Sequence, residues 1–508
     1  MTKSHFMHGI LCIFLTFALA ACASSRHPSG ENTVVVLYTT DTHGHIATDK
    51  DTIGLDMVAA VKKSLPGSVL LDAGDFLHGT ALAGFDKGKS VASIMRKAGY
   101  DAATAGNHEF SQGLEALMER REEMERGPVP MPILSANIFT ADGSPLLPPD
   151  TRLDVNGMAV CVFGLTTQET KTQSMPSTVA DLTFVHPEEA ARKAAERLRA
   201  SGCGLVIALV HLGSDVQVEY TSLDLAAAVP ELDAVIDGHS HREMYTMIRG
   251  TTPVVSSGSH GKAIGKLAFT LDSGTGRVLA ANNTLLRPGD LAGISPDPTL
   301  QAEISALQST VAEQLSQVVA WSDHALSGER GNMRTRETAL GNLAADALRA
   351  AYGTETGIVN SGGIRADLPK GPVTRGDILS IFPFGGNVIH VNVTGAELLD
   401  ILEHGVSRLP GADGCFPQIS GIALTVRADA PAGKRVASVH VNGALLKREK
   451  TYSLAINEFL AQGGDGYPHL SGMVRQQSWR TVEEVVIRFI KKHGVPSPDS
   501  AGKRIHVQ

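Results

Sequence analysis

Cysteine and basic charge are both scarce in this chain of 508 residues, and each shortage excludes a class of protein. The five cysteines match neither a zinc ribbon nor the dense disulfide framework of a small secreted domain. The formal net charge of −8 argues against broad binding to nucleic acid polymers or to an anionic membrane surface. No repeat or low-complexity tract interrupts the sequence. An anionic substrate would therefore have to be bound by local cations.

The start of the chain has the pattern of an export signal. An apolar run over residues 10–19 is too short to span a membrane as a mature helix. It leads into Leu19-Ala20-Ala21-Cys22, which resembles the cleavage box of bacterial lipoproteins. The resemblance implies that residues 1–21 are a signal peptide, that Cys22 is acylated, and that residues 22–32 form a tether. The protein would then be lipid-anchored in the cell envelope, facing the periplasm from the outer or inner membrane. An ordinary secretory signal is the alternative.

The remaining cysteines have no spacing that suggests a bond between them. Cys161 lies in an apolar strand pattern, Cys203 precedes another, and Cys415 lies in a glycine-rich loop. We expect all three to be small buried hydrophobic residues.

The chain divides into two α/β domains, as its length suggests, since single cores stop growing at about 250–300 residues. Short apolar strands alternate with helical patterns over residues 33–294, which predicts a layered α/β domain. A proline-rich break at 295–298 precedes an amphipathic pattern that predicts a helix ending near Val319, so residues 295–320 form the predicted linker. A second α/β domain is predicted over residues 321–508. Further helices are predicted over 187–200, 338–352, 395–406 and 481–493, and a strand pair over 263–271 and 278–286.

Five apolar segments of the first domain end in turns rich in metal-binding side chains. The turns are Asp41-Thr42-His43, Asp72-Ala73-Gly74-Asp75, Gly106-Asn107-His108-Glu109, the turn at His211, and Gly238-His239-Ser240-His241. This pattern predicts five strand ends at one edge of one sheet. If the strand conformation continues, Asp41 and His43 share one face, and so do His239 and His241.

Seven of these side chains are candidate metal ligands: Asp41, His43, Asp75, Asn107, His211, His239 and His241. Oxygen donors mixed with imidazoles suit zinc, manganese, cobalt or iron. Seven donors exceed the need of one tetrahedral ion, so we predict two divalent ions that share Asp75. Asp41, His43 and His241 would complete one site, and Asn107, His211 and His239 the other. Two ions about 3.5–4 Å apart can hold a bridging hydroxide and clamp both oxygens of an in-line displacement, which is phosphoester hydrolysis.

The order of these motifs resembles that of the calcineurin-like metallophosphoesterases. The forms DTHGH, DAGDF, GNHEF, VHLG and DGHSH are similar to the 5′-nucleotidase branch, which includes bacterial UDP-sugar hydrolases. The resemblance implies a four-layer α/β/β/α first domain, a linker helix and a C-terminal substrate-binding domain. It also implies that His108 stabilises the transferring phosphoryl group. Many members carry an aspartate where this chain has Ser111, which lacks the carboxylate charge. Ser111 is also a candidate N-cap for a helix over 113–125, and the two roles are compatible.

The second half carries motifs similar to the 5′-nucleotidase C-terminal domain: RTRET, NSGGIR, PFG and NEFLAQGGDGY. The resemblance thus covers nearly the whole mature chain. It implies that arginines bind phosphate, that an asparagine contacts the base and that two aromatic rings stack on it. The matching residues are Arg330, Arg334, Arg365, Asn360, Phe384 and Tyr467. Related enzymes carry an aspartate after the second aromatic that contacts the ribose; none follows Tyr467, so His469 and Ser471 are candidate substitutes.

The sequence therefore predicts a dinuclear-metal hydrolase of nucleoside 5′-phosphates, with UDP-sugars and 2′,3′-cyclic nucleotides as further candidate substrates. Two alternatives remain open. The same metal chemistry could serve a non-nucleotide substrate, as in the thiosulfohydrolase of sulfur oxidation. A lipid-anchored binding protein could also have lost turnover at Ser111.

Overall fold

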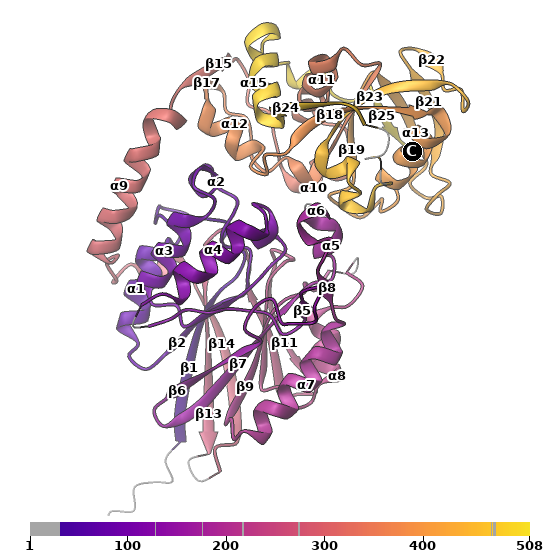
Figure 1. Cartoon of the computed structure of the whole chain (residues 1–508). Coiled ribbons are helices and arrows are strands. Elements are labelled where there is room, and N and C mark those ends of the chain that lie inside the picture. Colours follow the sequence, from indigo (N-terminus) through magenta and orange to yellow (C-terminus); the bar gives the residue numbers. More distant parts are fainter. Residues whose placement is uncertain are drawn as a thin grey trace, which may run out of the picture.

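A computed structural model describes residues 31–508 apart from 128, 175, 216–217, 273–274, 469 and 471–473. The predicted signal peptide, Cys22 and the tether up to residue 30 lie outside the described residues, as do His469 and Ser471. Two α/β domains are joined by helix α9 (Pro298–Leu315), which runs along one side of the molecule (Figure 1). The helix ends before the predicted Val319 because strand β15 (Val318–Ser322) begins there.

The first domain contains two six-stranded sheets. The first sheet has the order β14-β13-β1-β2-β3-β4, in which β1 to β4 are parallel and β13 and β14 are antiparallel additions. Its strands are β1 (Glu31–Thr39), β2 (Val69–Asp72), β3 (Ala102–Thr104), β4 (Ile133–Leu134), β13 (Ile264–Asp272) and β14 (Val278–Leu286). The last two confirm the predicted strand pair.

The second sheet has the order β11-β12-β10-β9-β7-β6. Its strands are β6 (Asp150–Val155), β7 (Met158–Thr166), β9 (Leu205–His211), β10 (Ala234–Asp237), β11 (Glu243–Ile248) and β12 (Thr252–Ser257). A short pair, β5 (Ile138–Phe139) and β8 (Thr183–Phe184), lies apart from both sheets.

One apolar core lies between the two sheets, and a helical layer covers each outer face. Val36 and Leu71 of the first sheet pack with Ile207 and Ile236 of the second. The first sheet's outer face is covered by α1 (Leu55–Ser64), α3 (Lys89–Ala98) and α4 (Leu114–Glu125). The second sheet's outer face is covered by α7 (Pro187–Ala200) and α8 (Ser222–Ala228). The predicted α/β/β/α layering is thereby confirmed.

Helix α7 shows how local sequence determines these elements. Pro187 occupies the first helical position, where its missing N–H is not needed. Ala190, Ala194 and Leu198 recur at helical spacing and are buried against the sheet. The acidic first turn and basic last turn match the helix dipole. The predicted bounds of this helix are confirmed.

The five predicted strand ends belong to two sheets, so the expectation of a single sheet is wrong. β1, β2 and β3 lie in the first sheet, whereas β9 and β10 lie in the second. Contacts between the sheets nevertheless bring the turns together. His211 Nδ1 lies 2.7 Å from the carbonyl oxygen of Ala73, and the N–H of His239 donates to the Asp41 carboxylate. The stacking of the sheets therefore creates a common edge.

Cys161 and Cys203 form a disulfide, so the prediction of separate buried thiols is wrong. They are 42 residues apart in sequence, and their Cα atoms are 5.9 Å apart. The parallel pairing of β7 with β9 places Cys161 opposite Val206, next to the segment that contains Cys203. Sequence spacing alone could not show that these strands are neighbours. Cys415 is a buried free thiol.

Replacing both disulfide cysteines, as Cys161→Ala with Cys203→Ala, should lower the free energy of unfolding by about 2–4 kcal/mol. The bond closes a long loop within the core of the second sheet, so its loss enlarges the entropy of the unfolded chain. Urea titration followed by circular dichroism measures the change. A reductant should destabilise the unaltered protein but not the double variant. Equal unfolding curves for the two proteins would contradict the prediction.

The second domain is built on a five-stranded sheet with the order β19-β16-β23-β18-β24. Its strands are β16 (Thr356–Asn360), β18 (Asn387–Thr394), β19 (Pro417–Ser420), β23 (Thr451–Asn457) and β24 (Val474–Thr481). Helices α11 (Ala339–Tyr352) and α15 (Val482–His493) pack on one face, and α13 (Gly395–Gly405) packs on the other. These three helices begin within one residue of their predicted starts.

Smaller elements complete this domain. Strands β20 (Ile422–Val426), β21 (Val436–Val441), β22 (Ala444–Leu445) and β25 (Ile505–Val507) form a second sheet, and β15 pairs with β17 (Gly371–Thr374). The short helices are α10 (Arg330–Met333), α12 (Arg375–Ile381) and α14 (Glu458–Ala461). Within the described ranges, no helix combines the length and apolar character needed to cross a membrane.

The two domains touch in several places besides the linker. Helix α2 (Ala81–Phe85) contacts α12, and α5 (Thr170–Gln173) contacts the turn Gly464–Gly466. His78 Nε2 lies 3.0 Å from the carbonyl oxygen of Pro383. The second domain is thereby held over the strand-end turns of the first (Figure 1).

Candidate active site

The metal-ligand candidates lie in tight turns rather than in continued strands. β1 ends at Thr39, and Asp41 and His43 follow with φ values of +49° and +48°. His239 and His241 have φ values of +79° and +58°. The expectation that each pair shares a strand face is therefore wrong. Left-handed backbone costs a residue other than glycine about 1–2 kcal/mol, and such strain concentrates at functional sites.

A first group of donors consists of Asp41, His43, Asp75 and His241, whose ligand atoms all lie within 4.8 Å of one another. His43 Nε2 and His241 Nε2 are only 2.9 Å apart. His43 Nδ1 lies 3.1 Å from the carbonyl oxygen of His78, which can only accept, so Nδ1 carries the proton and Nε2 a lone pair.

Burial lowers the pKa of both His43 and His241 well below the usual histidine value. Two neutral imidazole nitrogens this close together need either a hydrogen-bonding proton between them or a cation that both of them bind. His241 Nε2 also lies 3.5 Å from Asp41 Oδ1, and His43 Nε2 lies 3.9 Å from Asp75 Oδ2. The donors thus fit a divalent transition metal.

A second group consists of Asp75, Asn107, His211 and His239. His211 Nε2 is buried and lies 3.2 Å from Asp75 Oδ2. Among the described residues, however, it has no hydrogen-bond partner with suitable geometry. The Asn107 side-chain oxygen lies 3.1 Å from His239 Nδ1. The structure therefore brings all seven predicted ligands together, with Asp75 between the two groups.

The Asp75 carboxyl group is held as an anion. Burial alone would raise its pKa, but the neighbouring rings of His211 and His108 outweigh burial and hold the pKa well below its usual range. Its Oδ1 accepts a hydrogen bond of 2.8 Å from the N–H of His108. Its Oδ2 faces both histidine groups. This is the placement that a carboxylate shared by two cations requires.

Glu109 fixes the two turns that carry Asp75 and Asn107. Its buried carboxylate accepts hydrogen bonds from the N–H groups of Asp75, Phe76, Leu77 and Gly106 at 2.7–3.0 Å. Glu109 belongs to the GNHEF motif, but its sequence position alone predicts no role for it. Its four backbone donors depend on loop conformations that the sequence does not show.

Glu169 is a site residue that sequence analysis missed. Its Oε2 lies 3.1 Å from His239 Nε2, on the opposite side of the ring from Asn107. Gln173 donates to the same oxygen at 2.9 Å. A carboxylate behind a metal-binding imidazole fixes the ring orientation and raises its basicity. The run Gln168-Glu169-Thr170 contains no spacing that would reveal this contact.

A Glu169→Gln variant should bind divalent metal about 10–100-fold more weakly, because the amide no longer supplies negative charge behind His239. Isothermal titration of the metal-free protein with Zn²⁺ or Mn²⁺ measures the loss. Glu196→Gln is a matched control, since Glu196 is exposed on α7, which covers the outer face of the second sheet. Unchanged affinity in Glu169→Gln would show that the contact has no role in metal binding.

His108 lies beside the metal groups and contacts Ser111. Its Nδ1 is 3.1 Å from the Ser111 hydroxyl oxygen, and its Nε2 is 3.9 Å from Asp75 Oδ2. Burial lowers the pKa of His108 to about 3. Ser111 does not cap the following helix, because α4 is preceded by Gly113 and has no side-chain cap. The helix-cap interpretation of Ser111 is therefore wrong, and its contact is with His108.

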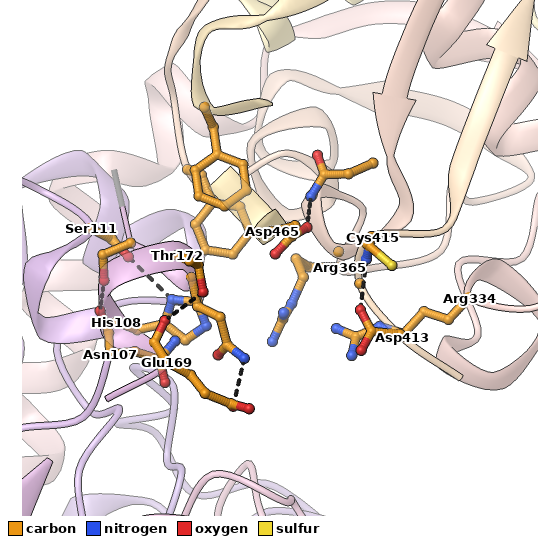
Figure 2. Close-up of a pocket in the computed structure, with 18 of the residues that line it drawn as sticks. Asn107, His108, Ser111, Glu169, Thr172, Arg334, Arg365, Asp413, Cys415 and Asp465 are labelled. Carbon is orange, nitrogen blue, oxygen red and sulfur yellow. Dashed lines mark hydrogen bonds between the residues drawn. The ribbon is translucent and has the colours of Figure 1, made fainter. Parts of the chain in front are cut away.

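A cavity of about 380 Å³ lies between the domains and joins these groups to the second domain. Asn107, His108 and Glu169 line it from the first domain, and Arg334, Arg365, Asp413 and Asp465 line it from the second (Figure 2). The predicted substrate residues Arg330, Asn360 and Phe384 line it too. Residues from both halves of the chain therefore enclose one space next to the metal-ligand candidates.

Three of the arginines that line this cavity, Arg330, Arg334 and Arg365, bring positive charge to it. Burial, together with the neighbouring Arg330, lowers the pKa of Arg334 to about 9 and that of Arg365 to about 10. Within the described part of the chain, none of the three guanidinium groups makes an ion pair or donates a hydrogen bond. Clustered guanidinium groups without a carboxylate partner are suited to phosphate oxygens.

Tyr467 does not face the cavity, so its predicted place opposite Phe384 is wrong. It is 3% exposed, and its hydroxyl donates to the carbonyl oxygen of Cys415. Phe459, eight residues earlier in the same motif, lines the cavity instead. Both aromatics stand in NEFLAQGGDGY, and the choice between them depends on the turn after β23.

The correction also changes the prediction about the ribose. Asp465 follows Phe459 by six residues and lines the cavity, so the expected aspartate is present in this chain. Its Oδ2 accepts a hydrogen bond of 2.7 Å from the Asn360 amide, and the Asn360 oxygen accepts one from Asn457. The predicted absence of this aspartate is wrong, because the second cavity aromatic is Phe459 and not Tyr467.

The fold and the carboxylate–imidazole cluster together define a metal-dependent phosphoester hydrolase of the calcineurin-like class. The family model "Calcineurin-like phosphoesterase" matches residues 34–243, and "5′-nucleotidase, C-terminal domain" matches residues 318–472. The chain belongs to the 5′-nucleotidase family.

Individual relatives agree with this assignment. A 5′-nucleotidase of Diplobatis ommata is 30% identical over 486 residues, which cover 87% of this chain and 82% of the relative. The trifunctional nucleotide phosphoesterase YfkN of Bacillus subtilis is 30% identical over 85% of this chain, but the chain spans only 32% of that protein. The structure of a 5′-nucleotidase precursor from Thermus thermophilus has a TM-score of 0.83 at 28% identity, covering 94% of this chain and 99% of the other.

Proposed function

We propose that the protein hydrolyses nucleoside 5′-phosphates with two divalent metal ions. The observation that carries the proposal is the shared cavity, which joins the metal-ligand candidates to the rings of Phe384 and Phe459 and to Arg330, Arg334 and Arg365. Among the described residues these three guanidinium groups have no ion-pair partner. A nucleotide fits this arrangement, because its phosphate can lie beside the metal-ligand candidates and the arginines while its sugar and base extend toward the aromatic rings. UDP-sugars and 2′,3′-cyclic nucleotides contain the same three parts and are further candidate substrates.

In this mechanism the two groups of ligands would hold one ion each, and Asp75 would belong to both. When bound, such ions would activate water at neutral pH and neutralise charge on the phosphoryl group. His108 contributes a donor to the phosphoryl oxygens, because its Nδ1 is occupied by Ser111 and its Nε2 faces the cluster. Arg330, Arg334 and Arg365 bind the remaining phosphate oxygens.

The second domain binds the nucleoside in this proposal. Phe384 and Phe459 stack on the base, and the hydrogen-bonded pair of Asn360 and Asp465 contacts base and sugar. The two aromatics argue against the thiosulfohydrolase-like alternative, which has no base to stack. The complete ligand set argues against a binding protein without turnover.

We also propose that the protein is exported and lipid-anchored through Cys22 in the cell envelope. The leader pattern supports export. The Cys161–Cys203 disulfide supports it independently, since disulfides persist in oxidising compartments. Globomycin, which blocks lipoprotein signal cleavage, should cause the precursor to accumulate, and Cys22→Ala should release the protein from membranes.

The substrate proposal is tested with the leaderless protein loaded with Mn²⁺, Zn²⁺ or Co²⁺. Phosphate release from AMP, UDP-glucose, 2′,3′-cyclic AMP and an aryl phosphate is compared. Phe459→Ala should raise the KM for AMP about 10-fold, because base stacking is worth about 1–3 kcal/mol, and change the KM for aryl phosphate much less.

Tyr467→Phe is the control, since it keeps the ring and removes only the hydroxyl that contacts Cys415. It should leave both KM values nearly unchanged. Activity on the aryl ester alone would favour the non-nucleotide alternative. Metal binding without release of phosphate from any substrate would favour a binding protein.

A further inference from the structure

His78 joins the metal-binding turns of the first domain to the second domain. It lies in the turn between β2 and α2, is 1% exposed, and is not one of the seven ligand candidates. Its backbone carbonyl oxygen lies 3.1 Å from His43 Nδ1 and accepts the proton of that nitrogen. Its own Nε2 donates a hydrogen bond of 3.0 Å to the carbonyl oxygen of Pro383 in the second domain. One residue thus contacts a metal-ligand candidate and the opposite domain.

Three aromatic rings meet at this contact. The rings of His78 and Phe384 are stacked, with centroids 4.9 Å apart and planes at 17°. The rings of Phe384 and His108 are 5.2 Å apart at 26°, and those of His78 and His108 are 6.0 Å apart at 23°. Offset-stacked aromatic pairs with centroids about 4.5–7 Å apart attract each other. Two histidines of the first domain therefore hold the ring of Phe384, which is half-buried and lines the cavity.

Packing alone does not explain a histidine at position 78. Because Nε2 carries the proton donated to Pro383, the neutral ring has its lone pair on Nδ1. Nδ1 is buried and, within the described ranges, has no hydrogen-bond partner. A buried polar atom without a partner lowers the stability of the fold. What histidine adds over an apolar ring is the hydrogen bond to the second domain.

The turn around His78 is fixed against the first domain. Gly79 has a φ of +138°, and a Cβ atom there would lie 2.6 Å from both the Cβ and the carbonyl oxygen of His43. A larger residue would therefore push this turn away from His43. The backbone of His78 is thus held by the first domain, while its ring contacts the second.

We propose that His78 is a positioning residue, which holds Phe384 against His108 through the hydrogen bond to Pro383 and the ring contact. Pro383 and Phe384 are adjacent in sequence, so the bond to one restrains the ring of the other. The inference rests on the proposed function, in which Phe384 stacks on the base and His108 meets the phosphoryl group. The loss of this contact should therefore weaken nucleotide binding more than it slows the metal-dependent step.

Three variants of the leaderless protein loaded with Zn²⁺ separate the parts of the contact. His78→Ala removes ring and donor, and should raise the KM for AMP about 10-fold while the KM for an aryl phosphate and kcat change less. His78→Phe keeps a ring but leaves the Pro383 carbonyl without its donor, and should raise the KM for AMP about 2–10-fold. His78→Gln keeps an N–H donor at similar reach, and should stay within about twofold. Metal content should not change, because the contact with His43 is made by the backbone.

A distance measurement tests the inference without turnover. Spin labels on Glu122→Cys and Lys491→Cys report the separation of α4 in the first domain from α15 in the second. Both positions are exposed, whereas the free thiol of Cys415 is buried and should not be labelled. In pulsed electron paramagnetic resonance the Zn²⁺ form should show one narrow distance distribution. His78→Ala should broaden this distribution or shift it to larger distances.

His186→Ala is the matched control for both measurements. His186 is an exposed histidine that precedes α7, and its side chain contacts Glu188 and Tyr220 of the first domain. Its replacement removes a helix cap without touching the contact between His78 and the second domain. The KM for AMP and the distance distribution should both stay unchanged.

Three outcomes overturn the inference. An unchanged distance distribution in His78→Ala would do so whether or not the protein hydrolyses AMP. A KM for AMP that rises as much in His78→Gln as in His78→Ala would show that the donated hydrogen bond has no positioning role. A loss of metal in His78→Ala would show that the residue acts through His43. By contrast, a broadened distribution in His78→Ala with no AMP hydrolysis by the unaltered protein would overturn the proposed function and confirm the contact.

Discussion

An Asp75→Asn variant is expected to hydrolyse AMP at least about 1000-fold more slowly than the unaltered protein. The amide can still accept the hydrogen bond from the N–H of His108, so the turn should keep its shape. The variant loses the negative charge of the Asp75 carboxylate. Its Oδ2 lies 3.2 Å from His211 Nε2 of one donor group and 3.9 Å from His43 Nε2 of the other. Metal catalysis is worth several kcal/mol, and each 1.36 kcal/mol corresponds to about tenfold in rate.

Metal content by mass spectrometry and turnover are measured on the same preparation. Asp72→Asn is the control, because Asp72 lies in the same motif but contacts Thr39 and the N–H of Gly74. Burial raises the pKa of Asp72 to about 8, so the replacement changes little charge at neutral pH. An Asp75→Asn enzyme that keeps two ions and turns over at the normal rate would exclude the shared-carboxylate arrangement.

The layers of the fold could be predicted because their signals are local. The apolar spacing of Ala190, Ala194 and Leu198 determines α7 without reference to any other segment. Strands such as Leu205–His211 are continuous apolar runs that end in a polar turn. The donors in those turns could be predicted for the same reason, since their type and order lie within a few residues.

What could not be predicted depends on which segments become neighbours. The pairing of β7 with β9 makes a disulfide from Cys161 and Cys203, which no sequence spacing indicates. Glu169 reaches His239 across 70 residues of sequence. The exchange of Tyr467 for Phe459 has a local cause, because both rings stand in one motif and only the turn decides which is buried. These errors involve long-range contacts or side-chain direction, not chemistry.

Because the cavity lies between the domains, both halves of the chain contribute residues to the proposed active site. Phe384 of the second domain lies against His78 and His108 of the first, with ring centroids 4.9 and 5.2 Å apart. The Arg365 guanidinium lies 5.6 Å from the Phe384 ring centre. The side of the cavity proposed to bind the base is thus in direct contact with His108, the residue proposed to meet the phosphoryl group. Any separation of the domains would divide the two parts of the site.

A His108→Ala variant should reduce kcat for AMP by about 10²–10³, the typical loss when one donor to a developing phosphoryl charge is removed. None of the seven ligand candidates is changed, so metal content should stay the same and KM should change less than kcat. Steady-state kinetics with metal analysis separates these effects. A fall in kcat that follows a loss of metal would instead show that His108 supports the metal centre.

Ser111 provides the matched comparison, since its contact in the cavity is with His108 Nδ1 at 3.1 Å. A hydrogen bond contributes about 0.5–1.5 kcal/mol, so Ser111→Ala should reduce kcat by about 2–10-fold. If serine acts only by orienting His108, Ser111→Ala should have no further effect in the His108→Ala background. Additive losses in the double variant would show that Ser111 contacts the substrate directly. The serine that replaces the family's usual aspartate would then have acquired a role of its own.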